Sequence, residues 1–134
     1  MSPVAYAQEP QSVEVFTAPR LTHFHRFVIS DLFKKQALEH NWDGYGSPPP
    51  SRAVVDRAVS ITTMLNFDDT VQAAVIALEG GGVQVDCARG SRELHLSFFP
   101  EGSVEYLKLQ DGRALCEGVL LSIDQLYELE SWID

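Results

Sequence analysis

The strongest constraint in this sequence is the alternation of apolar and polar residues over two short segments, 83–87 and 94–98. Apolar residues occupy every second position on both sides of Gly90-Ser91. If these two residues form a tight turn, the apolar positions of the two segments face one another. A shift by one residue would turn them to the opposite face, so the pattern fixes one register. The predicted pairs are Val83 with Phe98, Val85 with Leu96, Asp86 with His95 and Cys87 with Leu94.

Turn residues on both sides of this hairpin extend it into a meander. The apolar segment 71–78 precedes three consecutive glycines at 80–82. Pro-Glu-Gly at 100–102 brings Val104 opposite Phe98, and Asp-Gly at 111–112 is a strong hairpin signal. The segment 115–120 alternates poorly, which indicates an edge strand or an irregular one. We therefore expect four or five antiparallel strands.

Two helices are predicted before the strands. Ser30 is a suitable N-cap for a helix that ends near Asn41, and Phe33 is expected on its buried face. Ser51 is a suitable N-cap for a second helix that ends near Asn66. The buried stripe of that second helix is predicted to consist of Val54, Ala58, Ile61 and Leu65.

The last predicted helix has the clearest local signals. Ser122 and Gln125 have the spacing of a capping box, and Leu121 and Leu126 have the spacing of a hydrophobic staple. Its buried stripe is predicted to consist of Leu126, Leu129 and Ile133.

Together these elements predict an α+β fold. It has two N-terminal helices, a four- to five-stranded antiparallel meander, and a C-terminal helix packed on one face of the sheet. Residues 1–20, which contain three prolines, are expected to form a flexible tail, with one short strand around residues 13–16. Residues 21–134 are expected to form a single domain.

Composition narrows the class of protein. The chain has no apolar run of 18 residues and no basic segment followed by an apolar one near its N-terminus. We therefore expect neither a membrane span nor a secretory signal, and a cytoplasmic location. The two cysteines, Cys87 and Cys116, are distant in sequence and are expected to be free.

Negative charge is concentrated near the C-terminus. The formal net charge is −9, and residues 101–134 contain eight acidic and only two basic side chains. A surface of this kind repels nucleic acid and favours a basic partner. The alternative is that the charge only keeps the protein soluble.

The segment 41–50, with the sequence Asn-Trp-Asp-Gly-Tyr-Gly-Ser-Pro-Pro-Pro, is the most distinctive in the chain. In one interpretation, Trp42 and Tyr45 fill the core between the two helices and Asp43 binds nearby backbone amides. In the other, the two aromatic side chains line a binding site in which Asp43 is the polar anchor.

This loop resembles that of an uncharacterised group of small bacterial proteins, which carry N-W-D-G-Y-G-[AS]-x-P before a helix. The group continues with a Gly-Gly hairpin similar to residues 81–86 here, although Asp86 stands where Glu is expected. A Pro-[Asp/Glu]-Gly turn similar to residues 100–102 follows, and the resemblance covers about residues 38–109. It implies kinship and no particular activity.

Few residues are arranged for catalysis or metal binding. Asp86 and His95 are the one carboxylate–imidazole pair that the predicted register brings together, with Ser97 on the same face. An open sheet face excludes water poorly, so an ordinary cross-strand ion pair is the favoured explanation. His23 and His25 have a spacing found in metal sites, but two ligands are too few, so we expect no metal and no cofactor.

The sequence therefore favours a small protein-binding or regulatory module of the antitoxin, immunity or accessory type, which acts by stoichiometric binding. The candidate binding residues are Trp42, Asp43, Tyr45, Glu117, Asp124, Glu128 and Glu130. We expect Asp124, Glu128 and Glu130 to face solvent. The alternative is a small hydrolase-like enzyme that uses Asp43 or the Asp86–His95 pair. Self-association through a sheet edge is compatible with the first function.

Overall fold

The computed structural model describes residues 21–134. The tail and the short strand predicted before residue 21 lie outside the described residues. Within the described part of the chain, no helix has the length and apolar character needed to cross a membrane.

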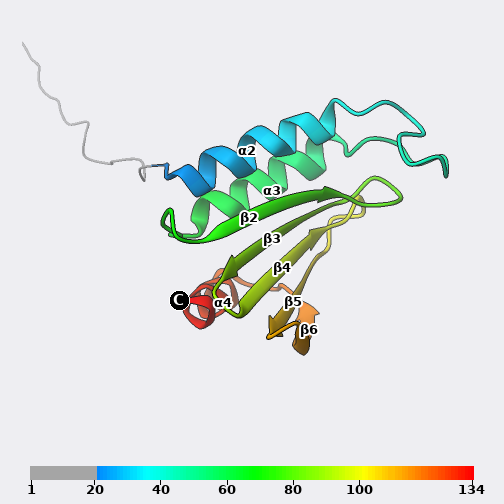
Figure 1. The fold of residues 1–134 in the computed structure, drawn as a ribbon. Coiled ribbons are helices and arrows are strands. Elements are labelled where there is room, and N and C mark those ends of the chain that lie inside the picture. The colour runs from blue at the N-terminus through cyan, green and yellow to red at the C-terminus, as the bar shows by residue number, and fades with distance from the viewer. Residues whose placement is uncertain (1–20) are drawn as a thin grey trace, which may run out of the picture.

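The described chain forms three helices and one antiparallel sheet (Figure 1). The helices are α2 (His23–Gln36), α3 (Arg52–Met64) and α4 (Ile123–Ile133). The strands are β2 (Gln72–Ala77), β3 (Val83–Arg89), β4 (Arg92–Phe98), β5 (Val104–Gln110) and β6 (Arg113–Val119). They are ordered β2-β3-β4-β5-β6, so each strand pairs with its neighbour in sequence. The predicted α+β class is confirmed.

The predicted register of the central hairpin is also confirmed. Val85 lies opposite Leu96, Asp86 lies opposite His95, and Val104 lies opposite Phe98 across the next turn. β6 is an edge strand with an irregularity opposite Lys108 and Leu109, as its poor alternation indicates. Turn chemistry and side-chain alternation agree throughout this region, which is why the sequence specifies the pairing so well.

One hydrophobic core is shared by the sheet and all three helices. Alternate residues of β3 and β4 are fully buried, and so are Val28 and Leu32 of α2 and Val54 of α3. Leu126, Leu129 and Ile133 of α4 are buried in the same cluster, as predicted. Figure 1 shows α2 and α3 side by side near β2, and α4 apart from them near the other strands.

The first helix begins earlier than predicted. Thr22, and not Ser30, is its N-cap, and Ser30 lies within the helix. The Thr22 side chain accepts a hydrogen bond from the backbone N–H of His25, and Nδ1 of the His25 ring accepts one from the backbone N–H of Thr22 at 3.0 Å. A histidine thus fills the position that Glu or Gln usually takes in a capping box.

This change also moves the buried face of α2. The helix ends at Gln36, before the predicted Asn41, and Phe33 is 52% exposed. Buried instead are Phe24, His25, Val28 and Leu32. The other ring nitrogen of His25 lies 2.6 Å from the carbonyl oxygen of Leu65, so this histidine joins α2 to the end of α3.

The turn between β2 and β3 depends on Gly82. A Cβ atom at this position would lie 2.6 Å from the carbonyl oxygen of Phe98. This distance is too short for any side chain. The β2–β3 turn can therefore pack against the end of β4 only because residue 82 is a glycine.

Ser122 is the N-cap of α4 as predicted, but the predicted capping box is incomplete, because the Gln125 side chain does not bond the backbone N–H of Ser122. The Ser122 hydroxyl accepts a hydrogen bond from the backbone N–H of Gln125 at 3.1 Å, and the Gln125 side chain accepts one from the backbone N–H of Leu121. Leu121 is 83% exposed, however, so the predicted hydrophobic staple with Leu126 is wrong. The Leu121 backbone is held beside α4, but its side chain lies in solvent.

Candidate functional site

The loop at 41–47 is organised around the carboxylate of Asp43. This carboxylate accepts hydrogen bonds from the backbone N–H groups of Tyr45 at 2.9 Å and Ser47 at 3.3 Å, and from the Ser47 hydroxyl. The hydroxyl contact is the main cause of a lowered pKa of Asp43, and the backbone contacts act in the same direction. Asp43 therefore stabilises the turn as a carboxylate.

Ser47 attaches this loop to the sheet. It is buried, and its hydroxyl accepts a hydrogen bond from the backbone N–H of Gly80 at 3.0 Å. Gly80 belongs to the β2–β3 turn, so one side chain joins two turns that are far apart in sequence.

The prediction that Trp42 and Tyr45 fill the core is wrong. Tyr45 is 82% exposed, while Trp42 is half-buried and its indole N–H donates to the carbonyl oxygen of Pro48 at 3.0 Å. The reason is geometric: α2 ends at Gln36, so the loop projects beyond the ends of the two helices (Figure 1). The loop instead presents one aromatic side chain, Tyr45, on a well-ordered turn.

Asp86 and His95 meet across the strands as predicted. The Asp86 carboxylate lies 3.6 Å from Nδ1 of His95, and the Glu93 carboxylate lies 3.0 Å from its Nε2. The Ser97 hydroxyl donates to the side chain of Gln84 at 3.2 Å and makes no hydrogen bond to His95. The imidazole is thus held between two carboxylates, without contact to the hydroxyl that a nucleophilic mechanism would need.

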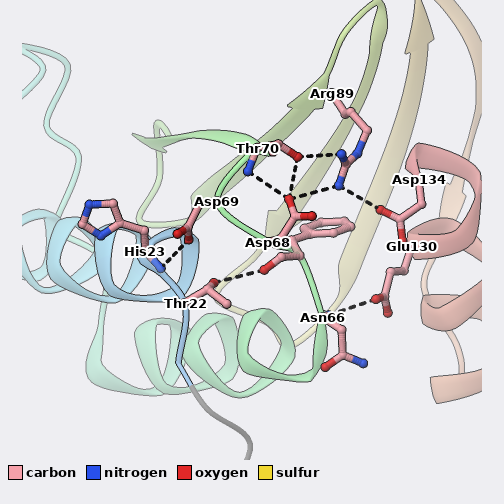
Figure 2. A network of polar contacts seen from close by, with 10 residues as sticks. Thr22, His23, Asn66, Asp68, Asp69, Thr70, Arg89, Glu130 and Asp134 are labelled. Carbon is pink, nitrogen blue, oxygen red and sulfur yellow. Dashed lines mark hydrogen bonds and ion pairs between the residues drawn. The ribbon is translucent and has the colours of Figure 1, made fainter.

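Glu130 does not face solvent, contrary to the prediction. It is buried, with 9% exposure, and its carboxylate accepts a hydrogen bond from the backbone N–H of Asn66 at 2.9 Å (Figure 2). Glu130 follows Leu126 by four residues, which places it on the same side of α4 as the buried stripe. Its charge serves to join α4 to the segment after α3.

A second acidic side chain near the end of α4, Asp134, also has a partner in the fold. Asp134 lies 3.3 Å from the guanidinium of Arg89, which is equally close to Asp68 and donates to the Thr70 hydroxyl (Figure 2). Hydrogen bonds from Thr70, and more weakly the charge of Arg89, lower the pKa of Asp68. This network connects the α3–β2 segment, the end of β3 and the end of α4.

Basic side chains also cover Trp132. The guanidinium of Arg92 lies 5.4 Å from the centre of its ring, and the ammonium of Lys108 lies 5.1 Å from it. Both are cation–π distances. We call residues 129–134 the anchored end of α4, because its charged and aromatic side chains contact the rest of the fold.

The beginning of α4 is different. Asp124 and Glu128 are exposed, and neither forms an ion pair within residues 21–134. Exposed apolar side chains lie beside them: Leu121 at 83%, Ile123 at 50% and Tyr127 at 45%. We call these five residues the α4-start surface.

An apolar hollow of about 230 Å³ lies next to this surface. Ile61 of α3, Val104 of β5, Leu126 of α4 and the connector residues 120–123 line it. Most sites for small molecules enclose 300–1,000 Å³. The hollow is therefore smaller than such a site and has the size to accept one large side chain.

Glu117 is not part of the α4-start surface. On β6 it lies opposite Leu107, which lies opposite His95. These positions alternate with the buried Leu94 and Leu96, so Glu117 occupies the sheet face opposite to the core. The structure thus separates Glu117 from Asp124 and Glu128, which the sequence placed in one acidic group.

A larger hollow of about 650 Å³ lies between α2 and the start of β2. Its lining includes Arg26 and Phe27 of α2 together with Asp69 and Ala73. It lies where the described chain begins, since Leu21 precedes its first lining residue, His23, by two positions.

No family model, curated protein or solved structure matches this chain. The resemblance of the 41–50 loop to a group of small bacterial proteins therefore stays a prediction.

Of the predicted binding residues, the structure places Asp124 and Glu128 together and leaves Tyr45, Glu117 and Glu130 apart from them. The apolar members of the α4-start surface were not predicted. The signal was the apolar run Val119–Leu121 followed by Ile123, which is longer than a cap requires.

Proposed function

We propose that this protein acts by stoichiometric binding to another protein, and that it binds through the α4-start surface. The observation that carries this proposal is the combination of exposed Leu121, Ile123 and Tyr127 with two acids that have no ion-pair partner among the described residues, on a surface whose Leu121 and Ile123 also line an apolar hollow. Antitoxins, immunity proteins and accessory regulators act in this way. The proposal also takes α4 to pack on the same sheet face as α2 and α3, and the shared core supports this arrangement.

Physical chemistry favours a protein as the ligand of this surface. Exposed apolar groups that cluster beside polar residues are typical of protein interaction sites. Acidic groups near such a cluster speed association with a basic partner and improve its specificity. The charge at the anchored end is paired or hydrogen-bonded by the fold, whereas neither Asp124 nor Glu128 has an ion-pair partner within the described residues, and Asp124 only interacts with the positive end of the α4 dipole.

The alternative function, a small hydrolase, receives less support. Asp43 is held by its own loop, and the Asp86–His95 pair lacks a contacting nucleophile. Neither of the two hollows described above is lined by Asp43, Asp86 or His95. Tyr45 remains a second candidate contact for a partner because it is exposed.

The proposal can be tested by affinity capture of partners from the native host, followed by binding measurements with the purified partner. We expect the double variant Asp124→Lys, Glu128→Lys to weaken binding about tenfold or more, mainly by slower association. Its matched control is Glu39→Lys, since Glu39 is an exposed acid elsewhere on the molecule. Equal loss in both variants, or no stoichiometric partner at all, would contradict the proposal. Sedimentation of the isolated protein tests self-association separately.

A further inference from the structure

The chemistry of the α4-start surface also specifies the partner. We infer that the partner inserts one large apolar side chain into the hollow between α3 and α4 and places basic residues against Asp124 and Glu128. This inference rests on the proposed function and names the kind of segment that the site would accept.

The hollow supports the first half of the inference. All its lining residues except Ser122 are apolar, and its volume of about 230 Å³ suits a single side chain. Ile61 of α3 forms one wall, and Ile123 with the start of α4 forms the other. Interfaces gain most of their affinity from a few such anchors in desolvated pockets.

The rim of the hollow is apolar as well. Ile123 and Tyr127 are four residues apart, so they lie along one side of α4. Each leaves about half of its surface exposed, and Leu121 leaves most of it. A partner segment that inserts its apolar side chain into the hollow would also cover these three side chains.

The charges support the second half. Asp124 and Glu128 are also four residues apart, which places their carboxylates in a row next to Ile123 and Tyr127. Nearby bases are already engaged: Lys108 lies over the ring of Trp132, and Arg57 donates to the carbonyl oxygen of Phe99. Bases from a partner, spaced about 5–6 Å apart, would pair with this row.

A second copy of this chain fits the site less well. A two-fold dimer places the same patch of both subunits in contact. It would bring the two pairs of Asp124 and Glu128 together, between chains that each carry a net charge of −9. The repulsion of like charges favours a basic partner over self-association.

A nuclear magnetic resonance titration with three synthetic peptides tests the inference. The probe is a helical Ala-based peptide with one Phe and with two Lys, three and seven residues after it, so that the two Lys are themselves four residues apart. One control replaces Phe with Ala, and the other replaces both Lys with Glu. We expect the probe to shift the amide signals of Leu121, Ser122 and Ile123, and each control to bind at least fivefold more weakly. Equal binding of all three peptides, or shifts confined to other residues, would overturn the inference.

Two variants localise the effect. Ile61→Phe fills the hollow from α3 and keeps both acids, so it should abolish binding of the probe. If this variant does not fold, Ile123→Glu tests the other wall of the hollow from an exposed position. Unchanged binding in a folded variant would overturn the inference.

The native complex separates this inference from the proposed function. If a captured partner binds the Ile61→Phe protein as tightly as wild type, the anchor is wrong, but stoichiometric binding stands. If no partner is captured, the proposed function fails as well.

Discussion

The two ends of α4 use the same kinds of residue for opposite purposes. At the anchored end, Glu130 and Asp134 meet a backbone N–H group and a guanidinium, and Trp132 lies beneath two cations. At the α4-start surface, Asp124 and Glu128 have no such partners within residues 21–134. Counting charges along a sequence therefore overstates the charge that is available for binding. Only the acids that folding leaves uncompensated can steer a partner.

The largest expected difference between the two ends concerns apolar burial. Leu129 is 3% exposed, so Leu129→Ala should lower the free energy of unfolding by about 2–5 kcal/mol. Leu121→Ala, at 83% exposure, should change it by less than about 0.5 kcal/mol. Urea denaturation of both variants measures the two values. A similar loss in both would remove the distinction between the two ends.

The next difference concerns the carboxylates. Glu130→Ala leaves the backbone N–H of Asn66 without its acceptor and should cost about 1–3 kcal/mol. Glu128→Ala should change stability by less than about 0.5 kcal/mol, since this side chain is exposed and unpaired within the described residues. Thermal melting of the two proteins under the same conditions compares them. A destabilised Glu128→Ala protein would show that the α4-start surface contributes to folding.

The cap of α4 is an exception to the contrast between the two ends. It lies at the start of the helix, where most side chains are exposed, and still contributes to stability. Ser122→Ala removes the acceptor for the Gln125 N–H and should cost about 1 kcal/mol. Ser122→Gly should cost only a few tenths of a kcal/mol. Equilibrium unfolding of both variants checks this order. If Ser122→Ala has no effect, the beginning of α4 is frayed in solution.

The smallest effect concerns pH at the anchored end. The pKa of Asp68 is lowered from its ordinary value of 3.8, so its carboxylate form is favoured in the folded protein. Its contribution to stability is complete above that value and is lost as the pH falls through the lower, folded-state pKa. The protection of the Thr70 amide, measured as its exchange rate relative to the intrinsic rate at each pH, should therefore fall below about pH 3.8, and more than the protection of the Gln125 amide does. In Asp68→Asn, this loss of protection at Thr70 should be absent.

Sequence reasoning succeeded where the signals are local and redundant. The register of β3 and β4 follows from alternation and from turn residues, which agree with one another. The Ser51 cap and the buried stripe of α4 follow from spacing alone. In each of these cases, a single shift would expose an entire apolar face.

Sequence reasoning failed where a residue type has an unusual role. The capping box of α2 uses His25, and aromatic residues surround it, so the true start of the helix resembled an irregular segment. Trp42 and Tyr45 suggested core residues by their type, but the end of α2 leaves them at the surface. Glu130 is buried through a contact with Asn66, which lies 64 residues away in sequence. No local pattern can reveal such a contact.

The close approach at Gly82 has an evolutionary consequence. Because a Cβ atom there would clash with the Phe98 carbonyl, mutation at this codon should be purged whatever the partner is. Asp124 and Glu128 are free of this restriction and should instead change together with the binding partner. Relatives of this protein should thus share the glycine even where the acidic residues have diverged. A lineage with a new partner should keep Gly82 and change Asp124 and Glu128.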